Sequence, residues 1–123
     1  MIGNRSELIK RFVLNAIADD FENLEQITKD VTNLSGKCGL TITSSEIVRG
    51  LGCLIETGLA KAYRLYASER PPDEISSLPP AKDIDHYYFG ITEKGMSVQL
   101  SDYDGWPFDE QNVLRKGWAA PTT

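Results

Sequence analysis

The sequence predicts an α+β domain in which three helices precede two strands and a short last helix. Apolar residues recur at helical spacing in three segments of the first half, between residues 5 and 57. From residue 59 onward, aromatic and branched residues with a roughly alternating character indicate strands. The length of 123 residues, with 41% hydrophobic and 25% charged residues, suits one globular domain with its own core.

The first predicted helix carries one broad apolar face on two adjacent ridges. Its members are Leu8, Ile9, Phe12, Val13, Ala16 and Ile17. Asn4 is suited to cap this helix, and Glu7 lies at the positive end of its dipole. Asp19 and Asp20 are acidic residues at the negative end, so we expect the helix to stop there. The width of the face suggests that a second subunit helps to cover it.

The second helix is predicted from Leu24, Ile27, Val31 and Leu34, which are spaced three, four and three residues apart. We expect it to end at Ser35-Gly36, because glycine adopts the left-handed closing conformation without a steric clash. The connector over residues 36–43 contains the β-prone run Thr41-Ile42-Thr43, which suggests a short strand.

The third helix begins with a capping box, in which Thr43 and Glu46 each satisfy the free backbone N–H of the other. Its apolar positions are Ile47, Val48, Leu51, Leu54 and Ile55, and Gly58 ends it. Gly50 and Gly52 inside the helix cost about 1 kcal/mol each relative to alanine. We therefore expect another chain segment to approach the backbone closely at these two positions.

Residues 59–67 and 85–92 are predicted to be two strands that form a hairpin. The segment 68–84 between them contains two Pro-Pro pairs, which indicate a long irregular loop. Thr92 is expected to cap a short helix that ends near residue 100. We expect one domain over residues 1–100 and a tail over 101–123. Because the tail contains Tyr103, Trp106, Phe108 and Trp118, we expect it to dock on the domain or on a partner subunit.

Three helices followed by a two-stranded hairpin is the order of the winged helix-turn-helix fold. Residues 48–60 resemble the recognition helix of MarR-type regulators, in which apolar residues precede a Gly-Leu pair by ten, seven and four positions. The matching residues are Val48, Leu51, Leu54, Gly58 and Leu59. Residues 87–95 resemble the second wing strand and exit of PadR-type regulators, through Phe89, Ile91, Thr92 and Gly95. The resemblance covers about residues 7–100 and implies a small transcriptional regulator that binds double-stranded DNA, typically as a homodimer.

On this reading the third helix enters the major groove and the hairpin contacts phosphates. We expect Ser44, Ser45 and Arg49 to face outward with Gly52 and Cys53, and Arg49 is suited to bind a guanine. The other candidate DNA-binding residues are cations of the hairpin and its loop: Lys61, Arg64, Arg70 and Lys82.

The charge of the chain opposes this reading, because phosphate contacts supply most of the non-specific affinity for DNA. The net charge is −5. Residues 44–67 carry three basic and two acidic side chains, whereas residues 68–84 carry two basic and four acidic ones. The alternative function is a winged helix that binds another protein. A positive surface over the third helix and hairpin would favour DNA, and a neutral or negative one would favour protein.

Other functions find little support in the residue types. One histidine, His86, and two cysteines, Cys38 and Cys53, are too few for a disulfide framework or a multi-histidine metal site. We therefore expect no enzymatic activity, cofactor or metal. A redox switch at Cys53 is a weaker alternative to two ordinary reduced cysteines. No apolar run approaches the roughly 20 residues needed to span a bilayer, and no secretory signal is visible, so we expect a cytoplasmic location.

Overall fold

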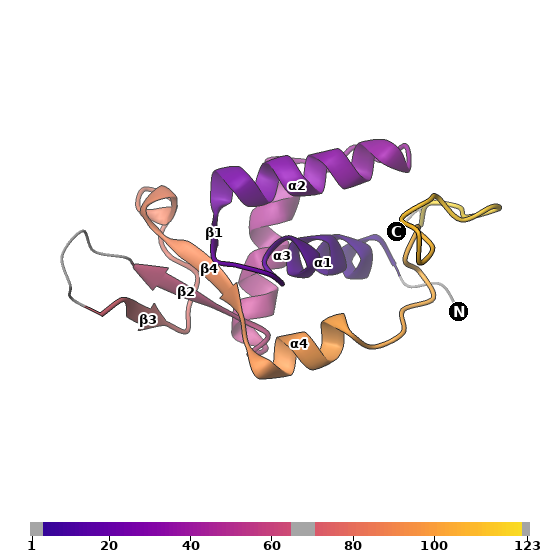
Figure 1. The fold of residues 1–123 in the computed structure, drawn as a ribbon. Helices are drawn as coiled ribbons and strands as arrows, with labels where there is room; N and C mark the ends of the chain where they lie inside the picture. The colour runs from indigo at the N-terminus through magenta and orange to yellow at the C-terminus, as the bar shows by residue number, and fades with distance from the viewer. Residues whose placement is uncertain (1–3, 65–70, 122–123) are drawn as a thin grey trace.

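The computed structural model describes residues 4–64 and 71–121, which form the expected α+β fold. Three long helices pack beside a four-stranded antiparallel sheet, with a short helix below them in the view of Figure 1. In chain order the elements are α1 (Arg5–Ala16), β1 (Glu22–Asn23), α2 (Leu24–Lys37), α3 (Ser44–Glu56), β2 (Ala60–Arg64), β3 (Asp73–Ile75), the 3-10 turn η1 (Ile84–His86), β4 (Tyr88–Ile91) and α4 (Glu93–Gln99).

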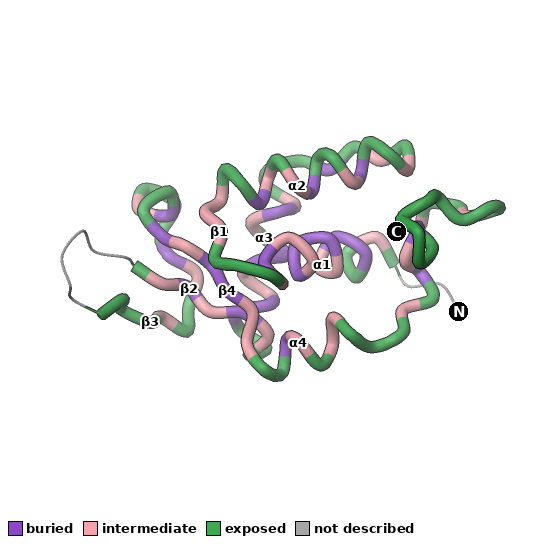
Figure 2. The backbone as a smooth tube through the Cα atoms, in the orientation of Figure 1, coloured by how far each residue is buried: buried purple, intermediate pink, exposed green. Residues whose placement is uncertain are grey.

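Helix α1 is the centre of the core, as the run of buried residues along it in Figure 2 shows. Its predicted apolar face is buried apart from Ala16, which is half-buried, and Asn4 caps the helix by accepting from the Glu7 amide at 2.8 Å. Leu14 is also fully buried, although it lies outside the predicted face. The cause is that α4 packs on α1 in addition to α2 and α3, and Leu14 lies where α1 meets both Leu54 of α3 and Val98 of α4.

The end of α2 differs from the prediction. The helix continues through Ser35 and Gly36 to Lys37, and the left-handed residue that follows it is Gly39, with φ of 75°. The Leu40 amide closes this end by donating to the Ser35 carbonyl at 2.8 Å. The expected strand at residues 41–43 is also absent from this described segment, because Thr43 serves as the N-cap of α3.

Helix α3 begins and ends as predicted. The Thr43 hydroxyl accepts from the Glu46 amide at 3.2 Å, and the Glu46 carboxylate accepts from the Thr43 amide at 3.0 Å. Gly58, with φ of 79°, follows the helix. At Gly50, α3 packs on α1, but a Cβ there would lie 3.4 Å from Cγ2 of Ile9, which is an ordinary van der Waals distance. The approach is therefore not close enough to require glycine.

The described residues form a sheet with strand order β1-β4-β2-β3, rather than the expected two-stranded hairpin. The expected pairing of β2 with β4 is present, from Ala60 opposite Ile91 to Tyr63 opposite Tyr88. The expected irregular loop instead contains β3, which pairs with β2 from Ala62 opposite Ile75 to Arg64 opposite Asp73. Strand β3 begins directly after Pro71-Pro72 and lies at the sheet edge, where prolines that lack an amide proton do least harm.

The last predicted strand is shorter than expected, because residues 84–86 form η1 and β4 begins at Tyr88. Residues 65–67 of the other predicted strand lie outside the described residues. Thr92 caps α4 as predicted, accepting from the Gly95 amide at 3.0 Å.

The tail after α4 lies against its own domain. The Trp106 ring packs edge-on against Phe12 of α1, with 5.2 Å between the ring centroids, and Phe108 packs on Trp106 in turn. The Trp118 indole donates to the Gly105 carbonyl at 3.0 Å. The apolar face of α1 that suggested a second subunit is therefore covered by segments of the same chain.

Candidate nucleic-acid interface

The first two turns of α3 present the exposed polar residues predicted for DNA contact. Ser44, Ser45 and Arg49 are exposed, while the opposite side of the helix is buried through Ile47, Leu51, Leu54 and Ile55. Val48, predicted as a core anchor, is only half-buried. Because its apolar side is packed against α1 and β2, the helix holds its polar side in a fixed orientation.

The middle of the predicted outward face is covered by the segment that follows β3. A Cβ on Gly52 would lie 3.4 Å from Cδ2 of Leu78, so the side chain of this segment, and not a helix, packs on Gly52 at an ordinary van der Waals distance. Gly52 and Cys53 are accordingly half-buried. The open part of the predicted outward face is thus concentrated at Ser44, Ser45 and Arg49, and Glu56 is exposed at the end of the helix.

The two cations on β2 face carboxylates of β3. The Lys61 ammonium forms an ion pair with the Glu74 carboxylate, which also raises the pKa of Lys61. This pair is diagonal, because Glu74 lies directly opposite Tyr63 in the strand register. Arg64 lies directly opposite Asp73. Side chains alternate along a strand, so Lys61 and Arg64 also point to opposite faces of the sheet.

The remaining candidate cations lie elsewhere. Lys82 is exposed in the turn before η1, and η1 packs against α2 rather than α3. Arg70 lies outside the described residues. The structure therefore brings Ser44, Ser45 and Arg49 together on α3, places Lys61 and Arg64 on β2 beside acidic residues, and puts Lys82 in a separate segment.

One contact next to this face was missed by the sequence reasoning. The Arg5 side chain joins α1 to the start of α3: its Nε donates to Glu46 at 2.8 Å and its Nη2 donates to the Thr41 carbonyl at 2.6 Å. The bond from Arg5, together with the amide of Thr43, lowers the pKa of Glu46 to about 2. Arg5 and Glu46 are 41 positions apart, so no local pattern could have revealed the pair. Arg49 lines the same small hollow between α1 and α3, which measures about 240 Å³.

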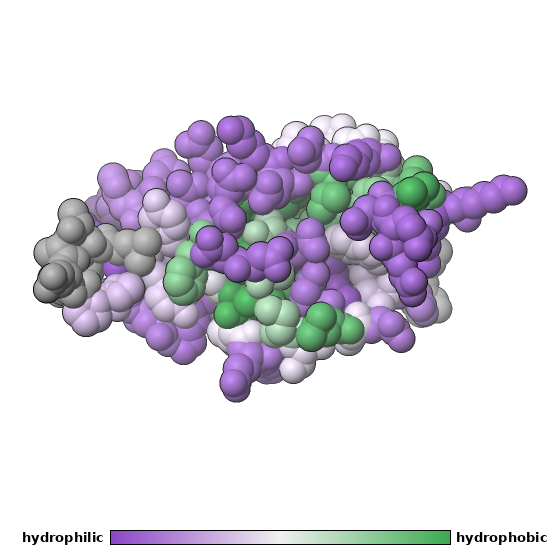
Figure 3. Space-filling view, in the orientation of Figure 1, coloured by the Kyte–Doolittle hydropathy of each residue, from purple (hydrophilic) through white to green (hydrophobic). Residues whose placement is uncertain are grey.

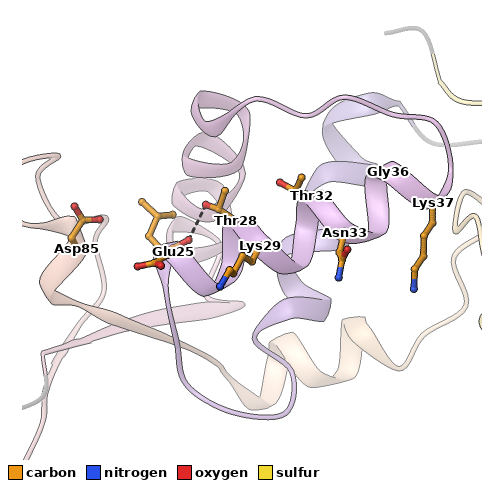
Figure 4. A pocket seen from close by; sticks show the side chains of 9 residues that line it. Glu25, Thr28, Lys29, Thr32, Asn33, Gly36, Lys37 and Asp85 are labelled. Atoms are coloured by element: carbon orange, nitrogen blue, oxygen red, sulfur yellow. Dashed lines mark hydrogen bonds between the residues drawn. The ribbon is translucent and has the colours of Figure 1, made fainter.

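A wide groove runs along the outer side of α2 and is drawn in Figure 4. It is lined along one helix face by residues that include Thr28, Lys29, Thr32 and Lys37, and Asp85 of η1 closes one end. Its polar side chains are spread along the helix and do not converge on one point (Figure 4). We therefore assign no chemistry to this groove.

Within the described segments, no three side chains among His, Cys, Asp and Glu come close enough to hold a metal ion. Burial raises the pKa of the Cys38 thiol, which disfavours the reactive thiolate there. No helix of the described chain is long and apolar enough to cross a membrane.

Comparisons with known proteins do not identify the chain. No protein-family model matches it, and neither the curated proteins nor the solved structures yield a match. The function therefore has to be argued from the arrangement of the residues described above.

Proposed function

We propose that this chain is a winged-helix domain that binds a specific double-stranded DNA site through the first two turns of α3. The order of three helices and an antiparallel hairpin supports this fold. The observation that carries the functional proposal is the exposed group of Ser44, Ser45 and Arg49 on a helix whose opposite side is in the core. A major groove admits one α-helix, and residues near the start of such a helix contact base edges.

In this arrangement Arg49 reads a guanine through two parallel hydrogen bonds, and the serine hydroxyls bind base edges or phosphates. A good bidentate contact of this type contributes about 1–3 kcal/mol of discrimination against the wrong base. The buried side of α3 and the Arg5–Glu46 pair at its start keep the helix in one orientation.

The paired cations of β2 limit what the hairpin adds to this binding. Lys61 is paired with Glu74, and Arg64 faces Asp73. Within residues 4–64 and 71–121, neither Arg49 nor Lys82 forms an ion pair. Even with one phosphate neutralised by each of these two cations, the logarithm of the binding constant would fall with the logarithm of the salt concentration with a slope no steeper than about −1.8 per protomer. This shallow dependence means that specific contacts by α3 must provide most of the affinity.

The test is selection of a binding site from a random duplex pool, followed by titration of Arg49→Ala against the selected site. We expect this variant to lose about tenfold in affinity, equivalent to about 1.4 kcal/mol within the range for one bidentate contact. Lys29→Ala, which removes an exposed cation from the outer side of α2, is the matched control and should bind like the wild type. Equal affinity of the Arg49→Ala and Lys29→Ala variants for the selected site would refute the assignment of α3 as the helix that contacts the bases.

A second candidate function is binding of another protein through the same face. The carboxylates of Asp73 and Glu74 beside the β2 cations favour it, because they leave the hairpin without excess positive charge. In that case no duplex should bind up to about 100 μM, which is the weak end of ordinary non-specific DNA affinity. A photo-crosslinking residue at Ser45 would then capture a protein partner that the same residue at Lys29 does not capture.

A further inference from the structure

A cavity of about 320 Å³ lies where α1, the end of α4 and the tail meet. Its size falls at the lower end of the range for small-molecule sites. The residues that matter for its chemistry are Arg11, Asn15, Gln99, Tyr103, Trp106 and Arg115. In the view of Figure 3, hydrophobic side chains gather between α1 and α4, whereas hydrophilic ones dominate over α2. The polar lining of the cavity is therefore set into an otherwise apolar junction.

Two polar atoms at this junction are buried without a hydrogen-bond partner in the described chain, namely Oε1 of Gln99 and the hydroxyl of Tyr103. The amide nitrogen of Gln99 holds this side chain in place, because Nε2 donates to Oδ1 of Asn15 at 3.1 Å. Its oxygen is thereby left as an acceptor without a donor. Each buried polar group without a partner costs about 1–3 kcal/mol. Neither atom has appreciable accessible surface in the structure, so binding has to be accompanied by a rotation of the Gln99 and Tyr103 side chains that turns these atoms toward the cavity. The hydrogen bonds gained offset the cost of that rotation.

The cavity also carries excess positive charge. The Arg11 guanidinium donates only to neutral oxygens, the carbonyls of Val98 at 2.7 Å and Ser101 at 2.8 Å and the Ser101 hydroxyl at 3.4 Å. It lies over the Tyr103 ring, 4.9 Å from its centroid, and forms no ion pair within the described residues. Burial lowers the pKa of Arg11, and this effect outweighs the opposite effect of the Glu7 carboxylate on the same helix.

Arg115 is the second guanidinium on the cavity wall, and it donates to the Asp104 carbonyl. Asp102 is the one carboxylate among the lining residues, so two cations face one anion. Arg11 is half-buried, whereas Arg115 and Asp102 are exposed. Arg11 is therefore the cation that gains most when an anion with good hydrogen-bond geometry is supplied, and arginine suits carboxylates in particular.

We propose that this cavity binds a small organic carboxylate that also carries a hydroxyl or amino hydrogen-bond donor. The carboxylate faces Arg11 and Arg115, and the donor bonds to Oε1 of Gln99 with the Tyr103 hydroxyl as the second polar partner. The apolar part of the molecule lies against the ring of Trp106. At about 30 Å³ for each water-sized unit, the cavity holds a molecule of roughly ten non-hydrogen atoms. This inference is independent of the proposed DNA-binding function.

The experiment is calorimetric titration of the whole chain with a panel of hydroxy- and amino-carboxylates of up to ten non-hydrogen atoms. Each is compared with its uncharged amide and with the carboxylate that lacks the donor. We expect one or more panel members to bind with 1:1 stoichiometry, and their amides and donor-free analogues to bind at least tenfold more weakly. Absence of binding across the panel, or equal binding of the amides, overturns the proposal.

Two variants then locate the site. Tyr103→Phe removes a hydroxyl without a partner, so the ligand-free protein should melt at an unchanged or higher temperature while ligand affinity falls about fivefold. The Arg115→Gln variant should bind the carboxylate at least tenfold more weakly than the wild type. Lys116 is an exposed neighbour that does not line the cavity, so the Lys116→Gln variant should bind the carboxylate with wild-type affinity. Wild-type affinity in both cavity variants would show that the ligand binds elsewhere and would overturn the assignment.

Discussion

The exchange of Glu74 for glutamine is predicted to strengthen the binding of any DNA duplex. In the structure the Glu74 carboxylate occupies the Lys61 ammonium, which is the cation of β2 on the same sheet face as Tyr63. Glutamine keeps the size and β3 position of the side chain but removes its charge. Lys61 then becomes available to neutralise a phosphate.

The expected magnitude follows from the number of phosphates neutralised. Each additional phosphate contact steepens the slope of log K against log salt by about 0.9, so the slope of the variant should be steeper than that of the wild type by about 0.9. Between 50 and 200 mM salt, the variant should therefore lose about 3.5-fold more affinity than the wild type loses, by the same relation. The side chains of this ion pair are 37% and 48% exposed, so removing the pair should leave the free energy of unfolding nearly unchanged.

Fluorescence anisotropy of a labelled random-sequence duplex at four salt concentrations measures both slopes. Glu110→Gln, which removes the same charge from an exposed site in the tail, is the control for the change in net charge. An equal slope for the wild type and the Glu74 variant would refute the reasoning that this pair neutralises the hairpin. An equal steepening of the salt slope in the Glu74→Gln and Glu110→Gln variants would assign the effect to net charge alone.

Two further predictions concern stability. Because the pKa of Glu46 is about 2 in the folded protein against an ordinary value of 4.5, its carboxylate stabilises the fold at neutral pH, and this contribution is lost as pH falls from about 4.5 to about 2. Glu46→Gln should cost about 1–2 kcal/mol at pH 7 and flatten the acid limb of a urea-unfolding series, whereas Glu56→Gln on the exposed side of α3 should do neither. At Gly95 a Cβ would overlap the Leu59 carbonyl oxygen, so Gly95→Ala should lower the free energy of unfolding by about 2 kcal/mol or more. Gly36→Ala, at an open position within α2, should raise the free energy of unfolding by about 0.5–1 kcal/mol. Thermal melts of the Gly95→Ala and Gly36→Ala variants measure the two opposite shifts.

The helices were predictable from the sequence because their signals are local. Asn4, Thr43 and Thr92 each cap the helix that follows within three residues, and all three caps are present in the structure. The end of α2 was mispredicted because two glycines lie close together, and Gly39 rather than Gly36 takes the left-handed conformation. Which of two such glycines closes a helix depends on packing around the last turn, which the sequence does not display.

The sheet was only half predictable, because strand pairing depends on contacts between distant segments. β1 and β3 contain two and three residues, too few to show an alternating pattern. For the same reason the neutralisation of Lys61 by Glu74 could not be foreseen, since it depends on the register of β3 against β2. The opposite directions of Lys61 and Arg64 follow from the alternation of side chains along a strand, which is a local property that the sequence does display.

The candidate face on α3 was better predicted than the hairpin. Helical spacing separated the exposed Ser44, Ser45 and Arg49 from the buried side, since one short segment contains the whole pattern. The cover that Leu78 provides over Gly52 comes from 26 positions away and left no local signal.

The central claim is tested most directly by titrating labelled duplex DNA with the wild-type chain at about 50 mM and 200 mM salt, the range over which phosphate contacts change affinity most visibly. The account predicts saturable binding with a slope no steeper than about −1.8 per protomer, and a higher affinity for a selected site than for random sequence. Absence of binding up to about 100 μM at the lower salt would contradict DNA binding and would assign the α3 face to a protein partner.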